Sequence, residues 1–140
     1  MKALLLMVAS AFLFSCAAEQ DKGVVWVTQD AWLEPVIFAA QSYLIGQGED
    51  VSQNRPGKDT NTAILFDPSH PRLGTAFSRW NLDGSQQNTI TIGGIFAKLT
   101  DGVQAVVMAH EIKHLLGYGH STRCGDLMSE FLHCQPESLD

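Results

Sequence analysis

The sequence predicts a single α+β domain with about four short strands and two helices. At 140 residues the chain has room for one domain and little else. Its strand-like runs are short and rich in β-branched residues, and two longer stretches carry apolar residues at helical spacing. In chain order, we expect a strand, a helix, three strands and a second helix.

The first strand and the first helix are predicted before residue 46. Residues 23–29 (GVVWVTQ) are β-branched and aromatic, which favours a strand. Asp30 is expected to cap the helix that follows, and Pro35 is tolerated there because it falls in the first turn. The apolar residues at helical spacing predict a face packed in the core: Trp32, Val36, Ala39, Ala40, Tyr43 and Leu44.

The remaining elements follow a polar loop that we predict over residues 46–60. Residues 62–67, 75–80 and 88–95 are short β-rich runs separated by turn signals. Thr100 and Asp101 are predicted to cap the last helix, which has apolar residues at Val103, Val106, Val107 and Ala109.

This last helix leads into residues 110–120 (HEIKHLLGYGH), the most informative part of the chain. On a helix, His110 and His114 lie one turn apart on one face, so both rings can reach a single metal ion. Glu111 lies about 100° around the helix from His110, close enough to act on a water at the metal without being a ligand.

Gly117 and His120 complete this metal-binding pattern. Gly117 allows the chain to leave the helix through a positive φ, and the turn can bring His120 back as a third ligand. Three nitrogen ligands leave the fourth tetrahedral position open, as a hydrolytic zinc needs.

The motif H-E-x-x-H-x-x-G-x-x-H resembles that of the metzincin zinc peptidases. Metzincins place a methionine-containing turn beneath the metal, and here Met128 follows His120 by eight residues. This short spacing, with Ser121 directly after the third histidine, is most similar to the matrixin branch. The resemblance implies one catalytic Zn²⁺, with Glu111 as the general base and Met128 as a hydrophobic floor. The implied zinc ligands are His110, His114 and His120.

The same resemblance implies a mixed, twisted sheet and a place for the substrate. The order of the predicted elements matches the N-terminal subdomain of matrixins. In that family the strand before the last one lies at the sheet edge, and the substrate adds to it as an antiparallel strand. By position this strand is residues 73–78, an ordinary edge strand being the alternative. The implied substrate-binding residues are Gly74, Thr75, Ala76 and Phe77.

Two features depart from the family pattern. Lys113 occupies a position that is usually small, and a cation too near the metal would weaken zinc binding. It lies about 60° to the other side of His110, so we expect its ammonium to reach solvent or an acid at the surface. After Met128, Ser129 and Glu130 replace the Tyr-Pro common in matrixins, so the resemblance does not define the pocket beyond the scissile bond.

Residues 1–15 are predicted to be a signal peptide. A minimal basic head precedes an apolar run over residues 3–14, which is too short for a comfortable transmembrane helix. Residues 13–16 (LFSC) resemble a bacterial lipobox, in which Cys16 is lipidated and becomes the mature N-terminus. The domain would then span residues 16–140 and be anchored to the lipid membrane.

An ordinary secretory signal, cut near Ala17 or Ala18, is the alternative to lipidation. Neither residue is the aspartate that tends to retain lipoproteins in the inner membrane. We therefore expect an exported protein of the bacterial cell envelope, in the outer membrane if the cell is Gram-negative.

Cys124 and Cys134 are an even pair in a chain predicted to leave the reducing cytosol. They flank Met128, and we expect a disulfide that closes a short loop around the methionine turn. Two alternatives remain open, namely free thiols or binding of the zinc by Cys124. His70 and His133 are assigned to no metal, and Asp67 and Asp83 lie in no ligand-rich loop for calcium.

These features together predict a secreted, lipid-anchored zinc endopeptidase that acts on a peptide or protein substrate as a monomer. The net charge of −6 argues against a nucleic-acid partner. Two other functions stay open: a zinc-binding surface lipoprotein without catalytic activity, and an amidase acting on cell-wall peptide. Glu111 counts against the former, because zinc binding alone does not need that carboxylate.

Overall fold

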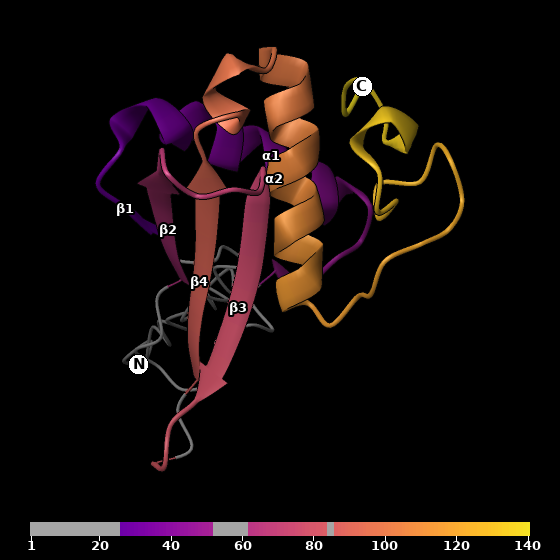
Figure 1. The fold of residues 1–140 in the computed structure, drawn as a ribbon. Coiled ribbons are helices and arrows are strands. Elements are labelled where there is room, and N and C mark those ends of the chain that lie inside the picture. The colour runs from indigo at the N-terminus through magenta and orange to yellow at the C-terminus, as the bar shows by residue number, and fades with distance from the viewer. Residues whose placement is uncertain (1–25, 52–61, 84–85) are drawn as a thin grey trace, which may run out of the picture.

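The computed structural model describes residues 26–51, 62–83 and 86–140 (Figure 1). The signal peptide predicted over residues 1–15, the lipidation site predicted at Cys16 and most of the predicted polar loop lie outside these residues. In chain order the elements are β1 (Trp26–Thr28), η1 (Ala31–Leu33), α1 (Glu34–Gly46), β2 (Thr62–Asp67), β3 (Gly74–Trp80), β4 (Gln86–Gly93), η3 (Phe96–Lys98), α2 (Asp101–Leu115) and η4 (Leu132–Cys134). The order predicted from the sequence is confirmed, and the fold is α+β.

The four strands form one mixed sheet in the order β1-β2-β4-β3. β1, β2 and β4 are parallel, because a helix or another strand lies between each of them in the chain. β3 runs antiparallel to β4 after a short connection, with Gly74 opposite Ile92 and Trp80 opposite Gln86. Within the part of the chain that the structure describes, this strand therefore lies at a sheet edge, as expected.

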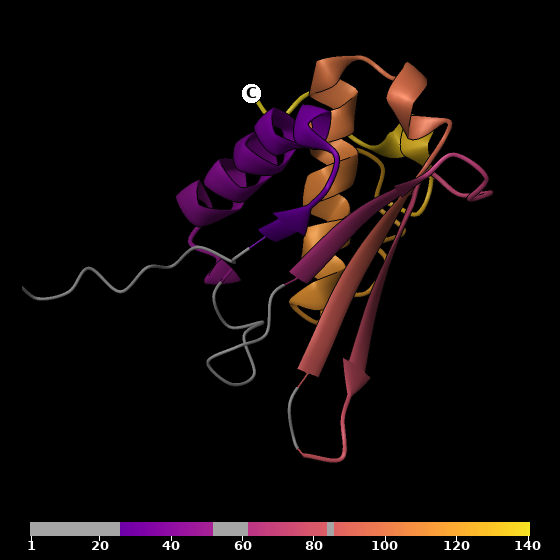
Figure 2. The same cartoon turned by 90° about the vertical axis from the view of Figure 1, so that its left-hand side faces the viewer.

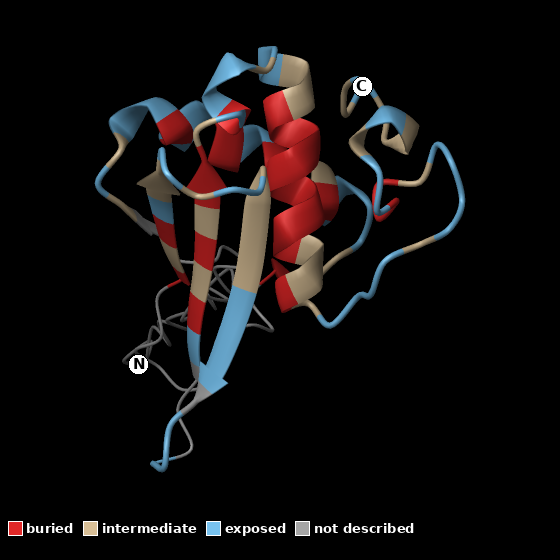
Figure 3. Cartoon of the chain, in the orientation of Figure 1, coloured by how far each residue is buried: buried red, intermediate tan, exposed pale blue. Residues whose placement is uncertain are grey.

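Both helices pack on the same face of the sheet (Figure 2). Every second residue of β2 and β4 points to them, which Figure 3 shows as alternating buried and less buried positions along these strands. Ile64, Ile90 and Ile92 are fully buried in this layer. The helices contribute Val36, Ile37, Ala40, Leu44, Val106, Met108, Ala109 and Ile112 to the same core.

The predicted apolar face of the first helix is only partly correct. Val36, Ala40 and Leu44 are buried, but Ala39 is exposed and Trp32 keeps 41% of its surface accessible. Trp32 belongs to η1, before the α-helical spacing begins, and its ring packs edge-on against Phe66 with 5.3 Å between the ring centres. The position of Trp32 is therefore set by its contact with the sheet residue Phe66 and not by the helical periodicity of α1.

Neither predicted helix cap makes a side-chain capping hydrogen bond. Asp30 precedes η1, and its carboxylate instead accepts a hydrogen bond from the main-chain N–H of Phe66 at 3.3 Å. Thr100 precedes α2 without a capping bond from its hydroxyl. Both positions mark the starts of helices, although Asp30 connects its segment to the sheet.

The connection from β2 to β3 passes close to the end of β4. A Cβ atom at Gly93 would collide with the main-chain oxygen of Arg72, and one at Gly94 would lie 2.6 Å from that of Pro68. The two glycines therefore allow residues 68–73 to cross the sheet end, and β4 ends at Gly93 and not at residue 95 as predicted. Within the described part of the chain, no helix is long and apolar enough to cross a membrane.

Candidate metal centre

The three histidines of the motif converge although they come from a helix and from the turn after it. The Nε2 atom of His114 lies 3.0 Å from that of His110 and 3.1 Å from that of His120. Two nitrogens bound to one tetrahedral zinc lie about 3.3 Å apart, so this spacing fits a small ion closely. Among the described residues, these histidines are the one group of three or more His, Cys, Asp or Glu side chains that could hold a metal ion.

The outer ring nitrogens orient two of these imidazoles. The Nδ1 atom of His110 lies 2.8 Å from the main-chain oxygen of Leu127, and that of His114 lies 2.8 Å from the oxygen of Tyr118. A carbonyl accepts only, so each Nδ1 carries the proton and each Nε2 presents its lone pair to the common point. Burial also lowers the pKa of both rings, which favours the neutral form that binds metals.

The turn between the second and third histidines has the geometry predicted for it. Gly117 has a φ of +93°, its N–H donates to the oxygen of His114 at 3.0 Å, and the N–H of Tyr118 donates to the oxygen of Lys113 at 3.1 Å. This pair of bonds is the Schellman motif, which ends a helix and reverses the chain. It brings His120 back to the ligand face of α2.

Glu111 lies beside this cluster and keeps only 6% of its surface accessible. Burial raises the pKa of its carboxyl to about 7, although a hydrogen bond from the main-chain N–H of Ala76 and the charge of Arg72 act in the opposite direction. A Cβ atom at Gly74 would lie 2.8 Å from a carboxylate oxygen of Glu111. The edge strand β3 therefore packs directly against the predicted catalytic base.

The four predicted substrate-binding residues are divided between the two faces of β3. Gly74 lines a cavity of about 390 Å³ together with His110, Glu111 and His120. Ala76 faces the core side, while Phe77 on the opposite face is 63% exposed. The hydroxyl of Thr75 lies 2.9 Å from Nε2 of His70, outside the cavity. The structure therefore brings Gly74 and Ala76 to the site but not Thr75 or Phe77.

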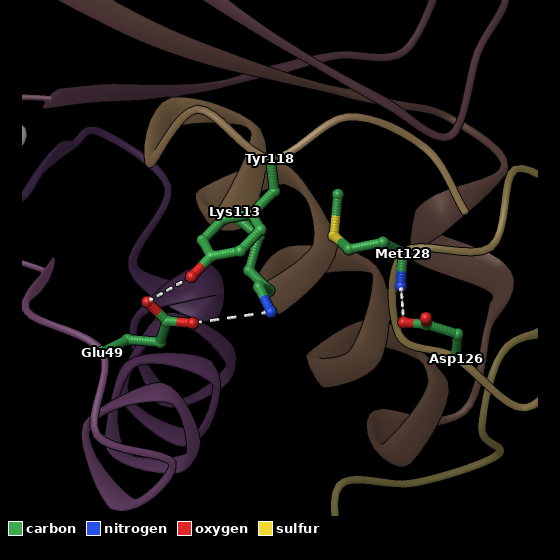
Figure 4. A network of polar contacts seen from close by, with 5 residues as sticks. All are labelled: Glu49, Lys113, Tyr118, Asp126 and Met128. Atoms are coloured by element: carbon green, nitrogen blue, oxygen red, sulfur yellow. Dashed lines mark hydrogen bonds and ion pairs between the residues drawn. The ribbon is translucent and has the colours of Figure 1, made fainter.

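The residues after His120 form the other side of the site. The N–H of Ser121 donates to the oxygen of Met128 at 2.7 Å, which closes a turn around the methionine. Asp126 holds this turn by accepting a bond from the N–H of Met128 at 2.9 Å (Figure 4). Met128 itself is 4% exposed. Our sequence interpretation missed Asp126, although an Asp two residues before a turn position is a known local signal.

A disulfide joins Cys124 to Cys134, as the sequence led us to expect, with 4.5 Å between their Cα atoms. Gln135 follows directly, and its amide nitrogen donates to the oxygen of Ser129 at 2.8 Å and lies 3.1 Å from Nδ1 of His110. The cross-linked segment therefore reaches the first histidine of the cluster. No local pattern in the sequence points to Gln135, because these contacts depend on the position of the disulfide.

The remaining polar candidates do not join the cluster. The ammonium of Lys113 lies 3.5 Å from the carboxylate of Glu49, which confirms that this cation reaches an acid (Figure 4). Asp67 accepts bonds from the N–H and the hydroxyl of Ser69. Among the described residues, no possible metal-binding group includes Asp67, Asp83, His70 or His133.

Comparisons of the chain with protein-family models, with curated proteins and with solved structures found no match. Three histidine side chains could hold a metal ion, because one ring nitrogen of each converges on a common point.

Proposed function

We propose that this chain is a zinc-dependent endopeptidase of the metzincin type, with Zn²⁺ held by His110, His114 and His120. The observation that carries the proposal is the convergence of three Nε2 atoms beside a buried glutamate that contacts an edge strand. Three imidazoles on a helix and its following turn are a donor set that suits zinc and leaves one position open.

Zinc, when bound here, supplies a Lewis acid that polarises an amide carbonyl and acidifies water. Glu111 is in place to accept a proton from the attacking water on its carboxylate oxygen and to return it to the leaving nitrogen. In the metal-free chain, burial raises the pKa of this carboxyl to about 7, which makes the carboxylate a stronger proton acceptor than an exposed glutamate. The N–H of Ala76 orients the carboxylate from the side of β3.

Among the described residues, no strand pairs with the outer edge of β3, and this supports a peptide substrate. An extended peptide can add to such an edge through main-chain hydrogen bonds, with its side chains in adjacent pockets. The cavity beside Glu111 offers apolar walls from Leu73, Val107 and Leu132 and charged groups from Arg72 and Glu130. This mixture of walls favours a side chain of moderate size with an apolar stem.

Hydrolysis of a diverse peptide library, with and without a chelator, tests the proposed activity. We expect the purified protein to contain zinc, and to cleave peptides only while it is bound. Glu111→Ala should retain zinc and lose activity by roughly 10²–10⁴-fold, because it removes the base and no ligand. Glu137→Ala is the matched control, since Glu137 is exposed and does not line the cavity.

Two results would contradict the proposal. One is a purified protein that contains no zinc, and the other is cleavage that survives chelation. A Glu111→Ala variant as active as the wild type would exclude Glu111 as the base. Zinc binding without cleavage of any peptide would favour a zinc-binding module without catalytic activity.

We also propose that the chain is exported and anchored by lipid on Cys16. The disulfide between Cys124 and Cys134 supports export, because such bonds persist in oxidising compartments. Cys16→Ser should leave an unprocessed or soluble form. Mass spectrometry that finds a free N-terminus at Ala17 or later would exclude lipidation.

A further inference from the structure

The segment between the second and third histidines is held by side chains as well as by its own turn. The ring of Tyr118 lies under the ammonium of Lys113, with 4.1 Å between Nζ and the ring centre. A Schellman motif is often accompanied by an apolar contact between these same two positions, and here a cation over an aromatic ring takes its place. Lys113 directly precedes His114, and Tyr118 accepts the hydrogen bond from that histidine.

The first helix, α1, also ends in a Schellman motif, and this motif faces the one at the end of α2. Gly48 has a φ of +86°, its N–H donates to the oxygen of Ile45 at 2.9 Å, and the N–H of Glu49 donates to the oxygen of Leu44 at 3.0 Å. Glu49 therefore has the position in its motif that Tyr118 has in the second. Because Leu44 is 1% exposed, the main chain of Glu49 is attached to the core through a short, ordered turn.

The two motifs are joined by the carboxylate of Glu49 (Figure 4). One carboxylate oxygen accepts a hydrogen bond from the hydroxyl of Tyr118 at 3.1 Å. The other lies 3.5 Å from the ammonium of Lys113. The side chains of Lys113 and Glu49 are only 19% and 20% accessible, so this contact is partly shielded from water. A residue 69 positions earlier in the chain thus holds the turn that joins His114 to His120.

We propose that Glu49, Lys113 and Tyr118 form an interlock between the ends of the two helices that positions His114 and His120 for the metal. These three are positioning residues, and none of them belongs to the histidine cluster. The inference uses the metal site of the proposed function but not the peptidase activity. It also gives the unusual lysine at position 113 a role in the turn.

The sign of one substitution separates this role from simple electrostatics. A lysine that acted only as a cation near the metal would repel it, so Lys113→Met would tighten zinc binding. A lysine that positions the turn would have the opposite effect, and Lys113→Met would weaken zinc retention despite the loss of a positive charge. Lys113→Arg keeps the charge and the stacking, and should behave like the wild type.

The experiment measures the rate of zinc loss to a chelator in the full chain. We expect Lys113→Met and Glu49→Gln each to lose zinc about three- to tenfold faster than the wild type. Each substitution removes a partly shielded charge contact, and Lys113→Met also removes the cation–π contact. Tyr118→Phe, which loses only the hydroxyl bond, should show a smaller increase. Absorption spectra of the Co²⁺-loaded variants should change, because the ligand geometry is less well defined. The matched controls are Lys98→Met and Glu34→Gln, both at exposed positions away from the interlock.

A second measurement uses metal-free protein. Amide hydrogen exchange at residues 117–120 should be faster in Lys113→Met and Glu49→Gln than in the wild type, and unchanged in the two controls. Unchanged exchange, or zinc retention equal to or tighter than the wild type in Lys113→Met, would overturn the interlock. A wild-type protein that binds no zinc would instead overturn the proposed function, and the exchange comparison would still decide whether the interlock orders the turn.

Discussion

His110 and Glu111 are neighbours on α2, yet they are held from opposite sides of the helix. Glu111 contacts β3, a strand whose position is set by a continuous ladder with β4. The ring of His110 is hydrogen-bonded to the main-chain oxygen of Leu127. Leu127 belongs to the C-terminal segment, residues 121–140, whose one regular element is the short η4. The C-terminal segment passes along α2 and is cross-linked by the disulfide (Figure 1).

The two sides of the helix are held rigid by different interactions. β3 is part of the sheet, so moving it would break several main-chain hydrogen bonds and uncover the core. The C-terminal segment has no such ladder. It is held by a covalent bond, a few turns, the amide of Gln135 and the packing of Leu127, Leu132 and Leu139 against the core. We therefore expect changes on the β3 side to affect the base, and changes on the C-terminal side to affect metal retention.

The largest expected effect comes from His114, whose ring is oriented by the main-chain oxygen of Tyr118. His114→Ala removes one of three ligands, so zinc should be lost on dialysis while the fold remains. Metal analysis and circular dichroism would check this. His133→Ala, at an exposed position outside the cluster, is the matched control. Full zinc content in His114→Ala would show that the site has been misassigned.

The β3 side can be tested through the pH dependence of stability in metal-free protein. The raised pKa of Glu111 means that the folded state holds this proton more tightly, so its stabilising effect is present at low pH and is lost as pH rises from 4.5 to about 7. The loss corresponds to about 3 kcal/mol in the free energy of unfolding. Glu111→Gln should not show this loss of stability as the pH rises, because the glutamine side chain does not titrate.

Urea unfolding of wild type and Glu111→Gln across this pH range would measure the difference. The lowered pKa values of His110 and His114 act with the opposite sign, because their contribution is lost as pH falls below 6.5. Both proteins contain these histidines, so that contribution cancels. A constant difference between the two proteins from pH 4.5 to 7 would contradict the burial of Glu111 against β3.

The C-terminal side can be tested by removing its cross-link. Cys124→Ser with Cys134→Ser should lower the free energy of unfolding by about 2–3 kcal/mol, as expected for a loop of this length. Zinc loss to a chelator should also become faster, since Gln135 and Leu127 are no longer held near His110. Thermal unfolding and chelation rates would show both effects. Two free thiols per folded, non-reduced wild-type chain would rule out the bond.

The smallest expected effect is a local one at Gly74. A Cβ atom there would lie 2.8 to 3.0 Å from three atoms of the Glu111 side chain, so Gly74→Ala should displace the carboxylate. We expect kcat/KM to fall about tenfold, equivalent to about 1.4 kcal/mol, while zinc content stays unchanged. Gly46→Ala is the matched control, because a Cβ there has nothing within 4 Å. If Gly74→Ala lost zinc in proportion to its loss of kcat/KM, the β3 side and the C-terminal side of the site would not be independent.

Local patterns in the sequence determined the secondary-structure elements of this protein and its candidate metal ligands. The spacing of His110 and His114 on a helix and the positive φ at Gly117 depend on geometry within a few residues, so they could be predicted. The strands from residue 62 onward could be predicted for the same reason. Two local predictions were wrong, the burial of Trp32 and the side-chain cap at Asp30. Both residues instead contact Phe66, which lies in a different element far along the chain.

Only the tertiary structure decided how the site is held and tuned. The burial that raises the pKa of Glu111 comes from packing against β3, and the contact of Gln135 with His110 depends on where the disulfide places it. The bond between Tyr118 and Glu49 joins residues 69 positions apart. Such contacts have no period or motif in the sequence, because they arise where elements far apart in the chain meet in space.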